Sequence, residues 1–322
     1  MNRHPDVSFA LADHGIHVVD TGFHRPRFDA AYLIIHAGRA AFVDCGTRHS
    51  VPRLLDALTT HGLGPSDVDW LILTHVHLDH AGGAGELMTH LPNAKLALHP
   101  RGARHMIDPS KLWAGASAVY GEAVMRRDYG ELVPVPAARV VEADDEYVVD
   151  LAGRRLRCLD TPGHARHHNA IFDEASGLVF TGDVFGLSYR EFDSAQGPFI
   201  LPTTSPVQFE PDALHASIRR IVSLAPVVVC PTHFGPVGAV ARLADDLHWM
   251  IDAMVAAATR LAEHSDRHAQ LVEALSALYC DRANAHGSPL STAAIRELLA
   301  VDIELNAQGL EVWLNQQRKA TA

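Results

Sequence analysis

Residues 71–83 place four metal-ligand side chains within six positions, directly behind a short apolar run. Imidazole nitrogens and carboxylate oxygens both bind divalent cations in proteins. In an extended loop His75 and His77 point to the same side, because successive side chains alternate, whereas Asp79 and His80 are turned toward a second ion. One ion cannot easily take all four groups, so the spacing predicts a site for two metals.

Chance clustering has to be considered, because the chain has 22 histidines in 322 residues. Three further ligand-type side chains argue against chance, since each follows an apolar run of its own: His164, Asp183 and His233. This repeated placement at the ends of apolar runs is typical of a metal site and not of a solvated histidine-rich loop.

Five short motifs resemble, in their order along the chain, the signature of the metallo-β-lactamase superfamily of binuclear metallohydrolases. They are Val43-Asp44-Cys45-Gly46, the His75 to His80 run, Thr161-Pro162-Gly163-His164, Thr181-Gly182-Asp183 and Pro231-Thr232-His233. The resemblance covers about residues 15–240. It implies an α/β fold, a four-layer αβ/βα sandwich with both metals at one edge between two mixed sheets, and an α-helical extension follows it in the chain.

The resemblance also assigns the ligands. Two divalent metal ions would be shared, metal one held by His75, His77 and His164, metal two by Asp79, His80 and His233, and both bridged by Asp183. Zinc (Zn2+) is the preferred metal because imidazole suits it, with iron (Fe) and manganese (Mn) as alternatives.

Two groups beside the ligands are candidates for indirect roles. The resemblance implies that Asp44 accepts the second N–H of a ligand histidine and so fixes its tautomer. A turn-forming aspartate at a strand end is the simpler alternative. His168 is expected to support the site or contact substrate, while His167 departs from the small residue that many relatives carry.

A binuclear centre points to a metal-dependent hydrolase that attacks with a metal-bridging hydroxide. Asp79 and Asp183 would orient the hydroxide, and Tyr189 is a candidate donor to the oxyanion. We expect a small ester, lactone or thioester as substrate. The alternatives are a phosphodiesterase, a di-iron redox or gas-binding protein, and a non-catalytic metal-stabilised binding module. Di-iron relatives typically carry a carboxylate where His77 stands, which disfavours that alternative.

The elements that must position these groups alternate between strand and helix along the chain. Strands are predicted at residues 16–19, 31–35, 40–43, 70–73, 95–99, around 140, 147–151, 155–159, 170–172 and 177–181. Helices are predicted at about residues 51–63, 84–91, 109–128, 211–224, 237–263, 267–281 and 291–317. We therefore expect a metal-binding domain at 1–240 and a helical C-terminal extension at 241–322, serving as a lid, a homo-oligomer contact or a small domain.

Two segments are candidates for the wall of a substrate pocket. Residues 185–209 leave directly from Asp183, and a long loop of this kind is usually functional. Residues 101–139 contain Tyr120 and Tyr129, although an ordinary helix covering a sheet is an equally good interpretation.

Composition limits the partners. The net charge of −11, with no long Lys or Arg run, disfavours nucleic acid, so a small-molecule substrate is expected. No run reaches the roughly 18 apolar residues of a membrane span, and the first residues enter no continuous apolar segment, so we expect a cytoplasmic protein with no membrane partner. The four cysteines lack CxxC spacing and are expected to be buried free thiols, with Cys45 and Cys230 as candidate metal-proximal thiols.

Overall fold

The computed structural model describes residues 11–204 and 208–321, which form two compact units. The first comprises the described part of Met1–Asp160 together with His167–Gly182 and Pro226–Pro236. The second comprises Thr161–Arg166, the described part of Asp183–Ala225, and that of Val237–Ala322. The predicted division at residue 240 stays a prediction.

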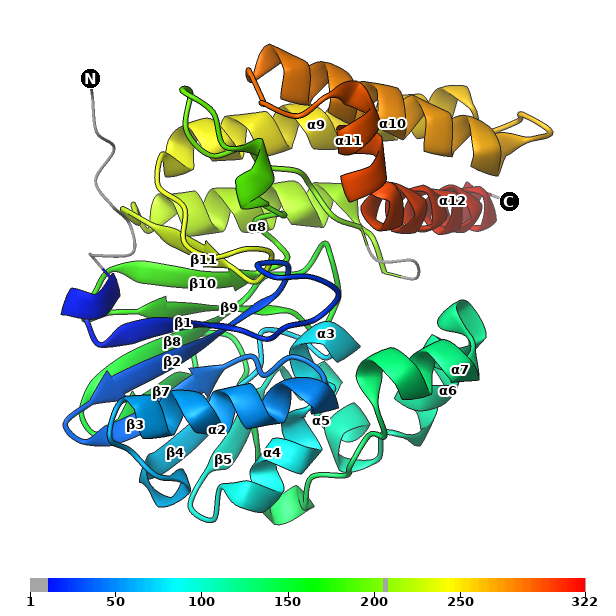
Figure 1. Cartoon of the computed structure of the whole chain (residues 1–322). Helices are drawn as coiled ribbons and strands as arrows, with labels where there is room; N and C mark the ends of the chain where they lie inside the picture. Colours follow the sequence, from blue (N-terminus) through cyan, green and yellow to red (C-terminus); the bar gives the residue numbers. More distant parts are fainter. Residues whose placement is uncertain (1–10, 205–207, 322) are drawn as a thin grey trace. The chain divides into compact units, whose positions relative to one another are not determined.

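A six-stranded sheet opens the first unit, with its strands in chain order (Figure 1). They are β1 (Ile16–Asp20), β2 (Ala30–His36), β3 (Arg39–Val43), β4 (Val68–Ile72), β5 (Lys95–Leu98) and β6 (Val140–Glu142). The pairs β1–β2 and β2–β3 are antiparallel, whereas β3, β4, β5 and β6 run parallel to one another. Helices occupy the crossovers between the parallel strands, as such connections require.

A five-stranded sheet completes the strands of the first unit, in the order β11-β10-β9-β8-β7. They are β7 (Val148–Leu151), β8 (Arg154–Asp160), β9 (Asn169–Asp173), β10 (Leu178–Gly182) and β11 (Val229–Pro231). Only β10 and β11 pair in parallel. The predicted strands are confirmed, with ends that shift by one or two residues.

Successive side chains of β2 point to opposite faces of the sheet, so they pack into two separate apolar clusters. Tyr32 and Ile34 pack with side chains of the second sheet, including Phe180. Leu33, from the opposite face of the same strand, packs with Leu54 of helix α2. The first sheet is therefore buried on both sides, which explains why its central strands read as continuous apolar runs.

The helices of the first unit follow the prediction with two corrections. They are α2 (Val51–Thr60), α3 (Leu78–Ala81), α4 (Ala84–His90), α5 (Pro100–Ile107), α6 (Ser110–Tyr120) and α7 (Glu122–Val124). The single helix predicted over 109–128 is wrong, because the backbone at Gly121 adopts φ 83° and ends α6. Helix α5 was not predicted, although Pro100 at its first turn is a helix-start signal.

The second unit is helical, and its long helices are α8 (Pro211–Ser223), α9 (Val240–Arg260), α10 (Arg267–Ala285) and α12 (Ala300–Thr321). The helix predicted over 291–317 is wrong in its continuity, because α11 (Thr292–Leu298) ends at Leu299 before α12 begins. Helix α9 contacts α8, α10 and α12, and its apolar side chains Leu247, Met250 and Met254 are buried. No helix among the described residues is long and apolar enough to cross a membrane.

All four cysteines are free and buried, as predicted. Burial raises the pKa of the Cys158 thiol to about 12. Cys45 donates from its sulfur to the His80 carbonyl oxygen at 3.2 Å, so it lies behind a ligand candidate and is directed at its backbone.

Candidate metal centre

The ligand candidates stand directly after strands. Strand β4 ends at Ile72 and leads into His75, while helix α3 begins at Leu78 and carries Asp79 and His80 on its only turn. Strand β11 ends at Pro231, two residues before His233. Because β4 and β11 both end near this edge of the first unit, residues more than 150 apart in sequence meet there.

Asp79, His80 and His233 form a compact group in the first unit, with one ligand atom from each lying within 4.8 Å of the others. The Nε2 atom of His233 lies 3.3 Å from Oδ2 of Asp79, and that of His80 lies 3.7 Å from the same oxygen. His80 and His233 are buried, whereas Asp79 is partly exposed. This is the set that the resemblance assigned to metal two.

The other ring nitrogen of each histidine is held by a fixed acceptor. His80 Nδ1 lies 2.8 Å from a carboxylate oxygen of Asp44, and His233 Nδ1 lies 3.0 Å from the carbonyl oxygen of Phe28. A ring nitrogen facing such an acceptor carries the proton, which leaves Nε2 as a lone pair directed at Asp79. The role that the resemblance implied for Asp44 therefore has its hydrogen bond.

Several hydrogen-bond donors hold the carboxylate of Asp44. Its carboxylate accepts from the backbone N–H of Thr74 at 2.8 Å, from the hydroxyl of Thr74 at 2.8 Å and from the hydroxyl of Thr232 at 3.1 Å. The backbone of Asp44 has φ 56°, a conformation that is uncommon for a residue other than glycine. These contacts fix the carboxylate and, through it, the ring of His80.

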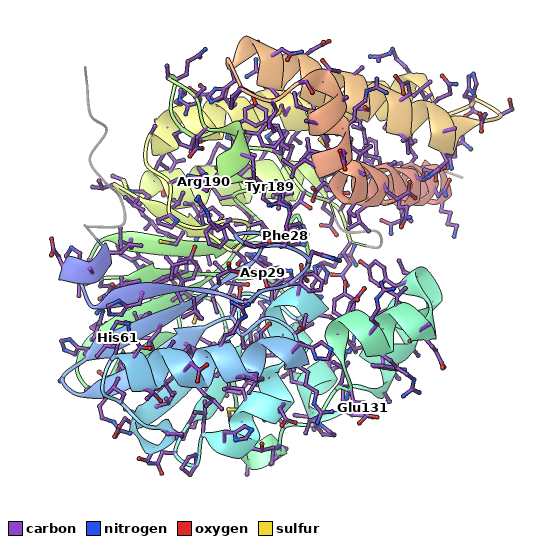
Figure 2. The ribbon with its side chains drawn as sticks, in the orientation of Figure 1. Phe28, Asp29, His61, Glu131, Tyr189 and Arg190 are labelled. Atoms are coloured by element: carbon purple, nitrogen blue, oxygen red, sulfur yellow. The ribbon has the colours of Figure 1, made fainter. Side chains whose placement is uncertain are left out.

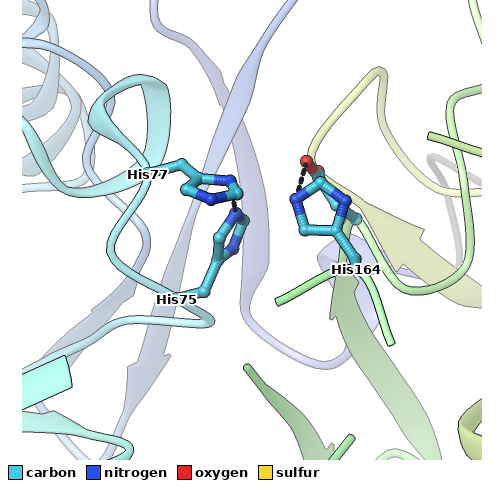
Figure 3. A group of neighbouring side chains, drawn as sticks. His75, His77 and His164 are labelled. Atoms are coloured by element: carbon cyan, nitrogen blue, oxygen red, sulfur yellow. Dashed lines mark hydrogen bonds and ion pairs between the residues drawn. The ribbon is translucent and has the colours of Figure 1, made fainter. Parts of the chain in front are cut away.

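His75 and His77 form a second group in the first unit, joined in Figure 3 by a dashed line. Nε2 of His75 lies 2.8 Å from Nδ1 of His77, and Nδ1 of His75 lies 3.1 Å from the Thr74 hydroxyl. His75 is fully buried and His77 partly so.

The second unit contains His164 and Asp183. Nε2 of His164 lies 3.3 Å from a carboxylate oxygen of Asp183, also drawn in Figure 3, and Nδ1 lies 3.3 Å from the Thr203 carbonyl oxygen. Asp183 follows β10 immediately and is 5% exposed. Burial of a carboxylate at this level requires compensation by hydrogen bonds or a cation.

These donor sets fit divalent cations. Two neutral imidazole nitrogens and a carboxylate directed at one point would repel one another through their lone pairs unless a proton or a cation lies between them. In the His80–His233–Asp79 group the ring protons are already committed to Asp44 and Phe28, so a cation is the natural occupant. Imidazole nitrogen with carboxylate oxygen is the ligand chemistry of zinc, and also of iron.

Comparison with known proteins agrees with this geometry. The profile of the metallo-beta-lactamase superfamily matches residues 24–233. The chain belongs to this superfamily. Its two sheets with flanking helices are the superfamily's α/β sandwich, and the C-terminal helical region continues beyond the matched residues.

The chain is also similar to individual proteins, at low sequence identity. The chain is 28% identical over 228 residues to a metallo-beta-lactamase fold-containing protein of Sulfurisphaera tokodaii, covering 69% of this chain and 78% of that protein. It is 27% identical over 201 residues to a hydroxyacylglutathione hydrolase of Aeromonas hydrophila, covering 62% of this chain but only 59% of the relative. A solved archaeal superfamily structure from Sulfolobus tokodaii has a TM-score of 0.65 at 25% identity, with 92% of this chain and 98% of that chain covered.

Tyr189, the candidate oxyanion donor, has a partner within its own unit. Its hydroxyl donates to the Asp302 carboxylate at 3.1 Å, and its side chain is 1% exposed. Figure 2 labels it beside Arg190, at the start of a short 3-10 turn. The catalytic role predicted for this superfamily member stays untested, and the observed hydrogen bond favours a packing role.

The other predicted neighbours of the ligands are His167, His168 and the segment 185–209. The His168 ring centroid lies 5.0 Å from that of His75, and His167 lies at 6.1 Å. His168 is fully buried against Gly182, which suits a supporting role. The segment 185–209 belongs to the second unit, but residues 205–207 of it lie outside the described residues.

Sequence reasoning missed the loop that precedes β2. Phe28 supplies the carbonyl that holds His233, and the fully buried Asp29 follows it (Figure 2). Burial, opposed by the nearby His233 and His80, raises the pKa of Asp29 to about 7. Thr21 donates its hydroxyl to Asp29 at 2.8 Å. The available signal was a lone aspartate placed immediately before an apolar strand.

Proposed function

We propose that this protein is a binuclear metal-dependent hydrolase acting on a small ester, lactone or thioester, with zinc as its metal. The observation that carries the proposal is the His80–His233–Asp79 group. The Nε2 atoms of both histidines face the Asp79 carboxylate, while Asp44 and the Phe28 carbonyl hold the Nδ1 atoms. Membership of the superfamily and the similarity to a hydroxyacylglutathione hydrolase support a hydrolytic role.

Two divalent cations, when bound, lower the pKa of a coordinated water and polarise the bond under attack. The chain's own groups would orient the reaction. Asp79 is partly exposed to solvent. Its Oδ2 atom lies 3.3 Å from Nε2 of His233, so the two atoms would bind the same metal ion. Asp44 has no access to substrate and acts only by holding His80. By the resemblance, His75, His77, His164 and Asp183 would also be metal ligands, and Asp183 would be the one that both metals share.

A substrate panel with metal analysis tests the proposal. We expect protein containing about two metals per chain to hydrolyse at least one of an aryl ester, a γ-lactone and an acyl thioester, and to lose that activity after chelation. Asp79→Asn, which keeps the shape but removes the charge, should lose activity, whereas Asp69→Asn, on β4 and paired with Arg39, should not. Preference for a phosphodiester would favour the phosphodiesterase alternative. A bound iron pair without hydrolysis would favour the redox alternative.

A further inference from the structure

A pocket of about 490 Å³ lies on the first unit beside the loop that holds His233. We call it the loop pocket, and its lining residues are Thr21, Gly22, Phe23, His24, Thr47, His49, Arg53, Arg127 and Asp128. Three segments therefore meet in it: the loop between β1 and β2, the turn into α2 with the first residues of α2, and the helical segment Met125–Tyr129 after α7.

The loop pocket adjoins the ligand group through direct contacts. The His24 ring packs edge-on against Phe28 at 5.2 Å, and Phe28 packs edge-on against His233 at 5.2 Å. On the other wall, Thr47 lies so close to the glycines after α3 that a Cβ at Gly83 would come within 2.6 Å of its carbonyl oxygen. Residues that line the loop pocket are therefore in contact with residues that flank the ligand group.

The loop pocket carries one uncompensated positive charge. Arg127 makes two hydrogen bonds, of 2.6 and 2.7 Å, to the carboxylate of Asp128, so these two charges offset each other. Arg53 makes only a 3.5 Å hydrogen bond to the Asp20 carbonyl oxygen, and within residues 11–204 and 208–321 it has no carboxylate partner.

Arg53 is exposed and lies against the loop between β1 and β2. The carboxylate of Asp20, in that loop, accepts from the backbone N–H groups of Gly22 and Arg27 at 2.9 and 3.0 Å. The guanidinium lies flat against Gly22, where a Cβ would meet its Nε at 2.6 Å. Gly22 has φ 75°, so both the backbone and the arginine require a glycine there. A guanidinium fork is the side chain best suited to a planar carboxylate.

We propose that the loop pocket binds a carboxylate of the substrate through Arg53, so that the enzyme prefers acyl substrates whose leaving group carries a carboxylate. The inference rests on the proposed hydrolase function and names the substrate class for it. A single carboxylate matches the single uncompensated charge, whereas a polyanion would meet the net charge of −11 on the chain. His24 and His49 also line the loop pocket.

A matched pair of substrates tests this. The acetyl thioesters of 3-mercaptopropionate and 3-mercaptopropionamide have nearly the same shape and differ in charge. We expect a higher kcat/KM for the carboxylate, and Arg53→Met should reduce that preference by about 10- to 100-fold, the effect of one charged hydrogen bond. Arg53→Lys should retain part of it, since it keeps the charge without the fork. Arg104→Met, an exposed arginine of α5 outside the pocket, should change nothing.

Direct binding separates this inference from the proposed function. The thioether acid 3-(methylthio)propionate cannot be hydrolysed, and its binding to the metal-loaded protein can be followed by NMR titration. We expect binding that weakens in Arg53→Met and at high salt. If no ester, lactone or thioester is hydrolysed but this acid binds through Arg53, the hydrolase proposal fails and the pocket assignment stands. Equal kcat/KM for the two thioesters, or the same preference in Arg53→Met as in the parent protein, would overturn the pocket assignment alone.

Discussion

The ligand candidates of the two units are held by different kinds of support. In the first unit, His80 is fixed by the Asp44 carboxylate at 2.8 Å and His233 by a carbonyl at 3.0 Å. In the second unit, His164 has a carbonyl acceptor at 3.3 Å and the carboxylate of Asp183 on its other side. Charged hydrogen bonds are shorter and stronger than neutral ones. The comparison suggests that the first unit presents its ligands already oriented, whereas the second depends more on the metal itself.

The largest expected effect is that of Asp183→Ala. If this carboxylate bridges the metals, its loss removes the ligand that both share, and most of the activity should disappear together with metal content. His168→Ala should retain both metals, because we place His168 in a supporting role, with its ring beside that of His75. Elemental analysis of both variants checks this. Equal metal loss in His168→Ala and His164→Ala would show that His168 is itself a ligand.

Asp44→Asn tests the support of the first unit. The amide keeps the shape but removes the charge that stabilises the proton on His80, so metal affinity should fall by about 10- to 100-fold. Thr203→Val is the matched change in the second unit, and it should have little effect because the backbone carbonyl accepts from His164. Competition with a chelator measures both affinities. A larger loss in Thr203→Val than in Asp44→Asn would reverse the comparison.

Tyr189→Phe has a smaller expected effect, on stability. Removing the hydroxyl removes a buried hydrogen bond to the Asp302 carboxylate, at a cost of about 1 to 3 kcal/mol in the free energy of unfolding. Denaturant unfolding gives that value, and kcat should change little. A fall in kcat of about 10²-fold with unchanged stability would instead support the oxyanion role predicted from the sequence.

The smallest effect concerns Cys45, whose thiol contacts the His80 backbone. Burial, with the nearby Asp44 carboxylate, raises its pKa well above the ordinary range, so the thiolate is scarce at pH 8. Because the first unit holds its ligands without metal, labelling of Cys45 by a disulfide reagent should remain slow after chelation. Peptide mapping of the labelled cysteines checks this. Rapid labelling of Cys45 in metal-free protein would show that Asp79, His80 and His233 lose their arrangement without metal.

The sequence was most informative where a local pattern determines the structure. Apolar runs located the strands, and ligand types at their ends located His75, Asp79 and His233. The break after α6 falls at Gly121, which has φ 83°. The glycine itself was the signal for this break in the sequence. The contact of His233 with Phe28 could not be predicted, because it joins residues 205 positions apart through a backbone atom. Any residue type at position 28 would offer the same carbonyl.

Hydrolysis during zinc titration of the metal-free protein tests the central claim most directly. Using whichever ester, lactone or thioester the substrate panel identifies, we expect the rate to rise with added Zn2+ and to level off at about two equivalents per chain, as a two-metal centre requires. A plateau at one equivalent would contradict the binuclear centre, and an absence of hydrolysis at saturating zinc would contradict the proposed function.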